Sequence, residues 1–241
     1  MKNRILYFPE KGKAALDEFK IIEPKDGEIL VRIAASAISG GTERALITGD
    51  PNCGICSDGK TSSFPRYAGY SAAGTVVKVG SNASGFKAGD RVALCWSDHI
   101  KYCTKPAKNA VLVPDNVSFN DAALAHIATF PLAAIRKCRP EIGESAIIMG
   151  QGLLGQIAVV LAKAAGLCPI LAVDPVKERR DKAMALGADY ALDPFDPDFA
   201  KKAKTLTAGG ACVAVEVTGL GKGLDQVLDC MRKFGRVALL G

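Results

Sequence analysis

The stretch Ser145-Ala-Ile-Ile-Met-Gly-Gln-Gly-Leu-Leu-Gly155 decides the fold of the carboxy-terminal half. An apolar run ending at Met149 predicts a strand, and a G-x-G-x-x-G turn follows it at the start of a helix. Such a turn needs glycine to bend tightly, to bring backbone N–H groups to a pyrophosphate and to pack helix on strand. The positive end of the helix then faces the anion. The stretch predicts a dinucleotide site at Gly150, Gly152, Leu153, Leu154 and Gly155, and the alternative is an ordinary glycine-rich turn.

An acidic residue stands where this interpretation requires one. Asp174 ends the next predicted strand, 19 residues after Gly155. A carboxylate there accepts the ribose hydroxyls and repels a 2′-phosphate, which favours NAD over NADP. Lys177, Arg179 and Arg180 follow closely, and a basic residue can accommodate that phosphate, so the preference for NAD is only moderate.

From about residue 143 onward, predicted strands alternate with predicted helices. This order predicts right-handed crossovers and a parallel sheet covered on both faces. The predicted strands are 145–149, 169–173, 189–192, 211–217 and 236–240, and the predicted helices are 153–165, 176–186, 199–206 and 224–232.

The amino-terminal half has a different rhythm, with short strands separated by turns. Residues 28–33 and 72–79 show the β-branched pattern of half-buried strands. Turn signals include Gly40-Gly41 and the loop from Gly80 to Gly85. This half is predicted to be an irregular, mostly β module, giving two domains, 1–126 and 127–241.

Composition limits the classes of function. The chain has 241 residues, 49% hydrophobic and 23% charged, and a net charge of +6. It can bury a core, which excludes a disordered chain, and its basic residues form no dense run of the nucleic-acid-binding or membrane-binding kind. No apolar stretch approaches the roughly 20 residues of a membrane span, and no signal segment opens the chain. We expect a cytoplasmic protein whose 8 cysteines are reduced and mostly structural.

Several motifs together resemble the medium-chain dehydrogenase/reductase superfamily, that is, the zinc-type alcohol dehydrogenases and their relatives. They are Gly41-Thr-Glu43, Pro65-x-x-x-Gly69-x-x-x-x-Gly74-x-Val76-x-x-x-Gly80, Phe86-Lys-x-Gly89-Asp-Arg-Val92, Val113-Pro-Asp115, Asp121-Ala-Ala123, the glycine turn, Asp174 and Leu186-Gly-Ala-Asp189. The resemblance spans nearly the whole chain. It implies a chaperonin-10-like β domain, a Rossmann domain, a nicotinamide cofactor and an active site between the domains.

The chain departs from that family at the metal. The positions of the three catalytic zinc ligands hold Gly40, Tyr70 and Ala125, and none of these side chains is a thiolate, imidazole or carboxylate. Ser71 replaces the glutamate beside the usual histidine. The four-cysteine structural-zinc lobe is missing, and Cys53-x-x-Cys56 is a lone pair that reads best as a plain loop. We therefore predict no metal site. Gly241 also falls where the family continues with a sixth strand, so we expect a fragment or a truncated product.

Without zinc, hydroxyl, phenol or imidazole donors must handle the proton of the reacting oxygen. Tyr70 and Thr42 are the candidate catalytic residues, and core packing or a turn explains each of them equally well. Thr129 matches the position that packs on the nicotinamide. His126 and His99 are the two histidines and have mainly structural interpretations, and catalysis is not assigned to Glu43.

The sequence therefore predicts an NAD(H)-dependent, zinc-independent oxidoreductase acting on a small alcohol or carbonyl compound, with no nucleic-acid or membrane partner and a possible homo-oligomeric state. Within the enzyme class the alternative is a quinone or enone reductase. A dinucleotide-binding module without turnover is the alternative outside it.

Overall fold

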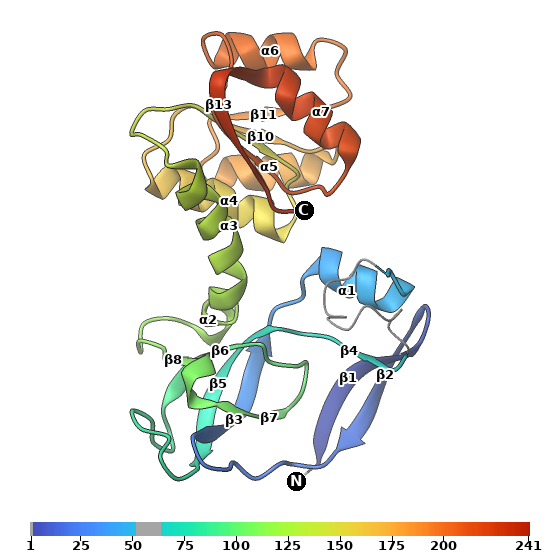
Figure 1. The fold of residues 1–241 in the computed structure, drawn as a ribbon, viewed down its shortest axis with the longest axis vertical. Helices are drawn as coiled ribbons and strands as arrows, with labels where there is room; N and C mark the ends of the chain where they lie inside the picture. Colours follow the sequence, from blue (N-terminus) through green and yellow to red (C-terminus); the bar gives the residue numbers. More distant parts are fainter. Residues whose placement is uncertain (1, 52–63) are drawn as a thin grey trace. The chain divides into compact units, whose positions relative to one another are not determined.

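A computed structural model describes residues 2–51 and 64–241. Contacts divide the chain into two compact units, Met1–Ile127 and Ala128–Gly241. Each unit has its own sheets and core (Figure 1). None of the helices in the described ranges is long and apolar enough to span a membrane.

The first unit contains a five-stranded antiparallel sheet in the order β7-β3-β5-β6-β8 and a three-stranded sheet in the order β2-β1-β4. The β-branched patterns of β3 and β5 place Ile29, Val31 and Val76 in its core. The strands are β1 Asn3–Glu10, β2 Lys13–Phe19, β3 Glu28–Ser36, β4 Arg66–Tyr67, β5 Ser71–Val79, β6 Arg91–Cys95, β7 Tyr102–Pro106 and β8 Ala110–Leu112, and the short helical segments are α1 Gly40–Thr48, η1 Ala107–Asn109 and α2 Phe119–Ala122.

Helix α1 corrects one prediction about this unit. Gly40 and Gly41, which the sequence suggested were a turn, form the first helical turn instead. A first turn makes few internal hydrogen bonds, so glycine costs less there than in a helix interior. The helix ends at Gly49, whose φ of 76° gives the left-handed cap typical of glycine.

The second unit is a five-stranded parallel sheet in the order β11-β10-β9-β12-β13. Its strands are β9 Ala146–Met149, β10 Ile170–Val173, β11 Tyr190–Leu192, β12 Ala211–Glu216 and β13 Met231–Leu239, and its helices are α3 Ala125–Cys138, which begins in the first unit, α4 Leu153–Ala164, α5 Lys177–Ala185, α6 Phe199–Leu206 and α7 Gly221–Cys230. The strand–helix alternation predicted from the sequence is confirmed, although α7 begins three residues earlier and β13 five residues earlier than expected.

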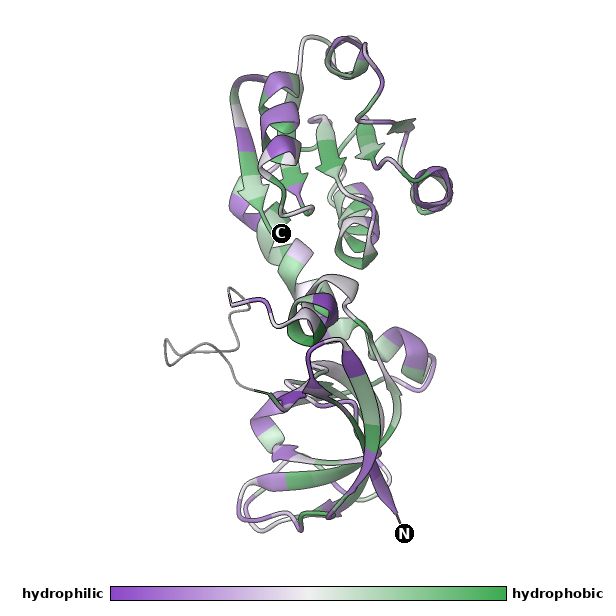
Figure 2. Cartoon of the chain, turned by 90° about the vertical axis from the view of Figure 1, so that its right-hand side faces the viewer, coloured by the Kyte–Doolittle hydropathy of each residue, from purple (hydrophilic) through white to green (hydrophobic). Residues whose placement is uncertain are grey.

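Helices cover both faces of this parallel sheet. One face packs Ile148 and Ala172 against α3, α4 and α5, and the other packs Ile147 and Leu171 against α6 and α7. Figure 2 shows the strands as mostly hydrophobic and α5 and α6 as largely hydrophilic on their outer sides. The chain order reverses between β9 and β12, and ligands of such sheets bind at the carboxyl ends of the strands flanking that point.

The described cysteines are free thiols, as the sequence predicts. Cys230 is fully buried, and burial raises the pKa of its thiol to about 11. Such a thiol behaves as a small apolar side chain. Cys53 and Cys56 lie outside the described residues.

Candidate functional site

The glycine turn lies directly after β9, at the carboxyl edge of the parallel sheet. A Cβ on Gly155 would lie 1.8 Å from the carbonyl oxygen of Gly150. Helix α4 therefore lies so close to the turn that only glycine fits at position 155. A Cβ on Gly152 would meet nothing within 4 Å. Gly155 is therefore required for packing, whereas Gly152 leaves the amino terminus of α4 open beside Leu153 and Leu154.

Asp174 is fixed to this turn. The backbone N–H of Gln151 donates to its Oδ2 at 2.8 Å, and the N–H of Val176 donates to Oδ1 at 2.9 Å. The side chain is 4% exposed. A carboxylate has about four acceptor positions, so two bonds leave capacity for ribose hydroxyls.

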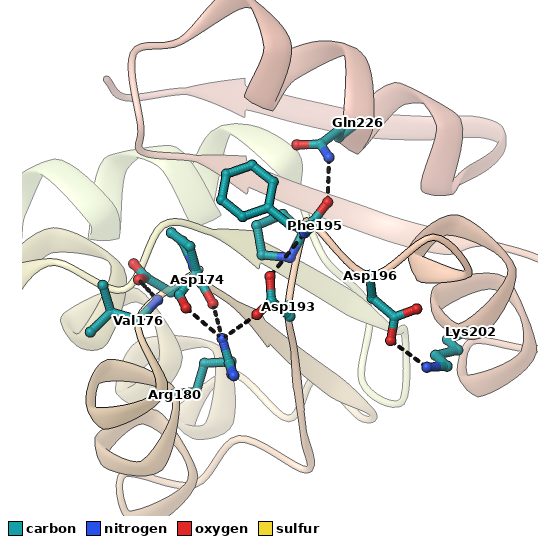
Figure 3. Close-up of polar contacts among 10 residues, drawn as sticks. Asp174, Val176, Arg180, Asp193, Phe195, Asp196, Lys202 and Gln226 are labelled. Atoms are coloured by element: carbon teal, nitrogen blue, oxygen red, sulfur yellow. Dashed lines mark hydrogen bonds and ion pairs between the residues drawn. The ribbon is translucent and has the colours of Figure 1, made fainter.

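The two arginines that follow Asp174, Arg179 and Arg180, differ in their contacts and exposure. Arg180 donates to the carbonyl oxygens of Asp174 and Pro175 at 2.6 and 2.9 Å, and to Asp193 at 3.1 Å (Figure 3). Arg179 is 54% exposed, and its Nη1 lies 3.6 Å from the Asp174 carboxylate. Arg180 thus ties β10 to the segment after β11, whereas the Arg179 side chain is the more exposed of the two.

Gln151 has a structural feature that the sequence analysis did not predict. Its side chain is completely buried, and its amide Nε2 donates to the carbonyl of Ile148 at 2.8 Å. Among the described residues, its Oε1 has no hydrogen-bond partner. An unpartnered buried acceptor is costly, and a hydroxyl or water at the turn could satisfy it. Together with the open Gly152 position, this orphan atom indicates that the turn fits a dinucleotide.

The candidate catalytic residues Thr42 and Tyr70 both lie in the first unit. Thr42 is in the first turn of α1, with its hydroxyl 3.2 Å from that of Ser39. Tyr70 directly precedes β5. Thr129 lies in α3 of the second unit, where it is exposed.

His99 connects the segments that carry Thr42 and Tyr70. Its Nε2 lies 3.0 Å from the Glu43 carboxylate and its Nδ1 lies 2.8 Å from the Ser36 hydroxyl. The His99 and Glu43 side chains are only 8% and 11% exposed. A Cβ on Gly69 would lie 2.7 Å from the backbone nitrogen of His99 and 3.1 Å from its ring carbon Cγ, so the chain before Tyr70 packs directly on this histidine. This network was not predicted from the sequence, in which the scarcity of histidine is the one feature that points to it.

Three aromatic side chains gather at Tyr70. The rings of Tyr70, Trp96 and His126 form an aromatic cluster, with centroid separations of 6.3, 5.9 and 4.8 Å. Ser71 assembles it, because its hydroxyl donates to the carbonyl of Ala123 at 2.5 Å and accepts from the N–H of Ile127, next to His126. Burial lowers the pKa of His126 below the ordinary 6.5, so the ring is neutral near pH 7.

The described residues do not fit a catalytic zinc ion. Within the described ranges, no group of three or more His, Cys, Asp or Glu side chains is placed to hold a metal. Gly40 and Ala125 offer no donor atom, and His126 packs edge-to-face against Trp96.

A mostly β unit followed along the chain by a Rossmann sheet with an acidic residue at its glycine turn defines a class of protein, the nicotinamide-dependent oxidoreductases built on two units. Comparisons with known proteins identify the family. Residues 25–170 match the alcohol dehydrogenase GroES-like domain, and residues 154–241 match the zinc-binding dehydrogenase model. The chain belongs to the zinc-type medium-chain dehydrogenase/reductase family and is an oxidoreductase of the alcohol dehydrogenase type.

Individual relatives show the extent of this similarity. The L-threonine 3-dehydrogenase of Pyrococcus furiosus is 29% identical over 265 residues, covering 97% of this chain and 73% of that protein. The solved 2R,3R-butanediol dehydrogenase of Bacillus subtilis has a TM-score of 0.85 at 22% identity, covering 98% of this chain and 76% of the other. A Sinorhizobium meliloti protein, provisionally described as a zinc-binding dehydrogenase and solved with NADP, has a TM-score of 0.86 at 21% identity, covering 100% and 77%. At these identities the solved structures establish the fold.

Proposed function

We propose that this chain is an NAD(H)-dependent oxidoreductase that transfers a hydride between nicotinamide and a small alcohol or carbonyl compound without a catalytic zinc ion. The observation that carries the proposal is the Asp174 carboxylate, held at the glycine turn by the N–H groups of Gln151 and Val176. A fixed negative charge at this place repels a 2′-phosphate and accepts ribose hydroxyls.

The coenzyme supplies the hydride donor or acceptor, and this chain's residues bind it and handle the substrate's proton. Backbone N–H groups at the amino terminus of α4 bind the pyrophosphate, with Gly152, Leu153 and Leu154 at the open turn. We assign to Thr129 the packing against the nicotinamide that the family resemblance implies. In carbonyl reduction the carbon gains a hydride and the oxygen gains a proton, and we assign that proton to the Tyr70 phenol or the Thr42 hydroxyl.

Titration with NADH and NADPH, followed by nicotinamide fluorescence, tests the coenzyme part. We expect saturable binding with NADH tighter, and Asp174→Ala should weaken NADH binding about tenfold while affecting NADPH binding less. Asp181→Ala is the matched control, because Asp181 pairs with Lys177 on the exposed side of α5. Equal losses for both coenzymes in Asp174→Ala would remove the proposed selectivity role.

Metal analysis and chelation test the zinc part. We expect purified protein to carry substoichiometric zinc and to oxidise NADH with a panel of aldehydes and ketones equally well before and after treatment with a chelator. Loss of turnover on chelation, restored by zinc, would contradict this part and leave the coenzyme assignment standing.

A further inference from the structure

The two most exposed large apolar side chains among the described residues lie at one edge of the second unit. Phe234 is 98% exposed and Ile142 is 90% exposed. Phe234 comes two residues before Arg236, where β13 resumes its pairing with β12, and Ile142 lies in the loop before β9. Both are therefore at the amino-terminal ends of the parallel strands, from which β13 runs to the end of the chain (Figure 1). The glycine turn lies at the opposite edge, after β9.

Phe234 lies in an irregular part of β13. Ala211 pairs with Met231 and Val213 pairs with Arg236, so the residues between these pairs form a bulge. The φ of Phe234 is 62°, a left-handed conformation that suits glycine and that bulky residues rarely adopt. Backbone strain of this kind is concentrated at functional sites. The strain at an exposed aromatic residue points to a role for its side chain.

The segments that carry these two side chains are rich in basic residues. Residues 136–145 and 232–236, here called the basic edge, contain six basic residues and two acidic ones. The six are Arg136, Lys137, Arg139, Arg232, Lys233 and Arg236. Arg236 joins the two segments, because it donates to the carbonyl of Arg139 at 2.9 Å and forms an ion pair with Glu144. The other five basic residues are exposed, so the basic edge has an excess of positive charge.

Close packing fixes the two apolar side chains in place. A Cβ on Gly210 would lie 2.5 Å from the backbone nitrogen of Arg232, so the bulge packs directly on the chain before β12. The Arg232 guanidinium also donates to the Cys212 sulfur at 3.5 Å. On the other segment, a Cβ on Gly166 would lie 3.4 Å from the Ile142 side chain. Both segments are therefore ordered before any partner binds, which lowers the entropic cost of binding.

Two protruding apolar side chains on a positively charged edge match the surface of an anionic membrane. We propose that the basic edge binds peripherally to an anionic lipid surface, with Phe234 and Ile142 at the boundary of headgroups and acyl chains and the basic side chains beside the headgroup phosphates. Such binding combines buried apolar area with the attraction of Lys and Arg to anionic lipids. The prediction of no membrane partner rested on the absence of a dense basic run in the sequence, whereas the fold assembles this edge from separate segments.

Other partners match the basic edge less well. A second copy of the chain would bring the same positive charges together, and like charges repel. Single-stranded nucleic acid stacks its bases on aromatic side chains, and Ile142 offers no π face. A stable protein interface buries about 800 Å² per partner around a core depleted in charge, which two isolated side chains among basic residues do not supply. A lipid surface requires neither a π face nor a broad apolar core.

Flotation of the whole chain with lipid vesicles tests the proposal. The vesicles consist of phosphatidylcholine alone or of phosphatidylcholine with about 30% phosphatidylserine. We expect partitioning onto the anionic vesicles to be at least about tenfold stronger, and to weaken when salt is raised from about 0.1 M to about 0.5 M. Equal partitioning onto both kinds of vesicle, or no partitioning onto either, would overturn the proposal.

Phe234→Gly is the decisive variant, because glycine suits a φ of 62° and the change removes only the apolar side chain. Its urea midpoint should be at least that of the wild type, while its partitioning onto anionic vesicles should fall about tenfold. Lys233→Glu, which reverses one exposed charge, should weaken partitioning at least about fivefold. Wild-type partitioning by a folded Phe234→Gly protein would overturn the proposal.

Phe195 and Lys222 provide matched controls at the other edge of the same sheet. Phe195 is 68% exposed after β11, and the Lys222 Nζ lies 5.5 Å from its ring at the start of α7. Phe195→Ala and Lys222→Glu should partition within about twofold of the wild type. Losses as large as those of Phe234→Gly and Lys233→Glu would contradict the placement of the lipid site.

Two further measurements distinguish the other partners. Binding of a single-stranded oligonucleotide, or formation of a dimer in sedimentation, that Phe234→Gly abolishes while vesicle binding persists would reassign the basic edge to that partner and overturn the proposal. NADH binding should be the same in the wild type and in Phe234→Gly, because the glycine turn lies at the opposite edge of the sheet. The proposed coenzyme role is thus decided separately from the lipid site.

Discussion

The glycine turn after β9 and the segment around Tyr70 both lie where the family's motifs place function, but they differ in what they preserve. At the turn, the proposed coenzyme contacts depend on backbone geometry, and Gly150, Gly152, Gly155 and Asp174 keep the whole pattern. Around Tyr70 the proposed proton transfer depends on side chains, and the metal-ligand positions that the family resemblance implies hold Gly40, Tyr70 and Ala125. At Gly155 a side chain would meet the carbonyl oxygen of Gly150, so this turn depends on glycine, whereas the chemistry of the Tyr70 region depends on which side chains its strands carry.

The glycine turn should not accept a side chain at Gly155. Gly155→Val should be the most damaging change, because its Cβ would lie 1.8 Å from a backbone carbonyl and α4 would have to move. We expect a loss of at least about 3 kcal/mol in the second unit, measured by hydrogen exchange of β9 and β10. Gly152→Ala is the control, and its exchange rates should match the wild type. Native stability in Gly155→Val would show that the turn is not constrained by packing.

The stability of the first unit should depend on the buried hydrogen bonds of His99 with Glu43 and Ser36. Glu43→Ala leaves His99 without its carboxylate partner at 3.0 Å and should cost about 1–3 kcal/mol. Unfolding in urea, followed by Trp96 emission, reports on the first unit. Glu43→Gln, which keeps an acceptor oxygen, should recover part of the loss, and exposed Arg44→Ala should change stability by less than about 0.5 kcal/mol. If Glu43→Ala and Arg44→Ala are equally stable, the network does not support the site.

Replacing Arg180 should lower the stability of the second unit more than replacing the adjacent Arg179. Arg180→Ala removes donors to two carbonyls and to Asp193 and should cost about 1–2 kcal/mol in the second unit. Arg179→Ala should leave stability within about 0.5 kcal/mol, because the residue is largely exposed. Hydrogen exchange of β10 and β11 measures both variants, and a larger effect from Arg179→Ala would reverse the assignment.

The smallest expected effect concerns pH. Burial lowers the pKa of His126 below 6.5, so between that lowered pKa and 6.5 the unfolded chain binds more protons than the folded chain. Stability of the first unit should therefore rise with pH in this window, and His126→Gln should flatten the slope. Urea midpoints from Trp96 emission across about pH 5–7 measure the slope. An unchanged slope in His126→Gln would assign the pH dependence to other groups.

The sequence was most informative where periodicity carries the signal. The strand–helix alternation after residue 143 reproduces the parallel sheet, because buried strands and amphipathic helices each impose their own pattern. The structure of the first unit was harder to predict from the sequence. Gly40-Gly41 suggested a turn and is helical, because glycine is tolerated in a first helical turn. The Ser36–His99–Glu43 network could not be predicted, because Ser36 and His99 are 63 residues apart and no periodicity connects them.

Local pattern and residues at fixed spacing were enough to predict the family, a β part followed by a Rossmann part, and the place of the glycine turn. Only the three-dimensional contacts distinguish the buried hydrogen bonds of Arg180 from the exposed side chain of Arg179, and bring Tyr70, Trp96 and His126 together. Those relations depend on how β-strand register and the Ser71 hydrogen bonds bring distant segments together. A sequence records which side chains are present, and packing decides which of them share a site.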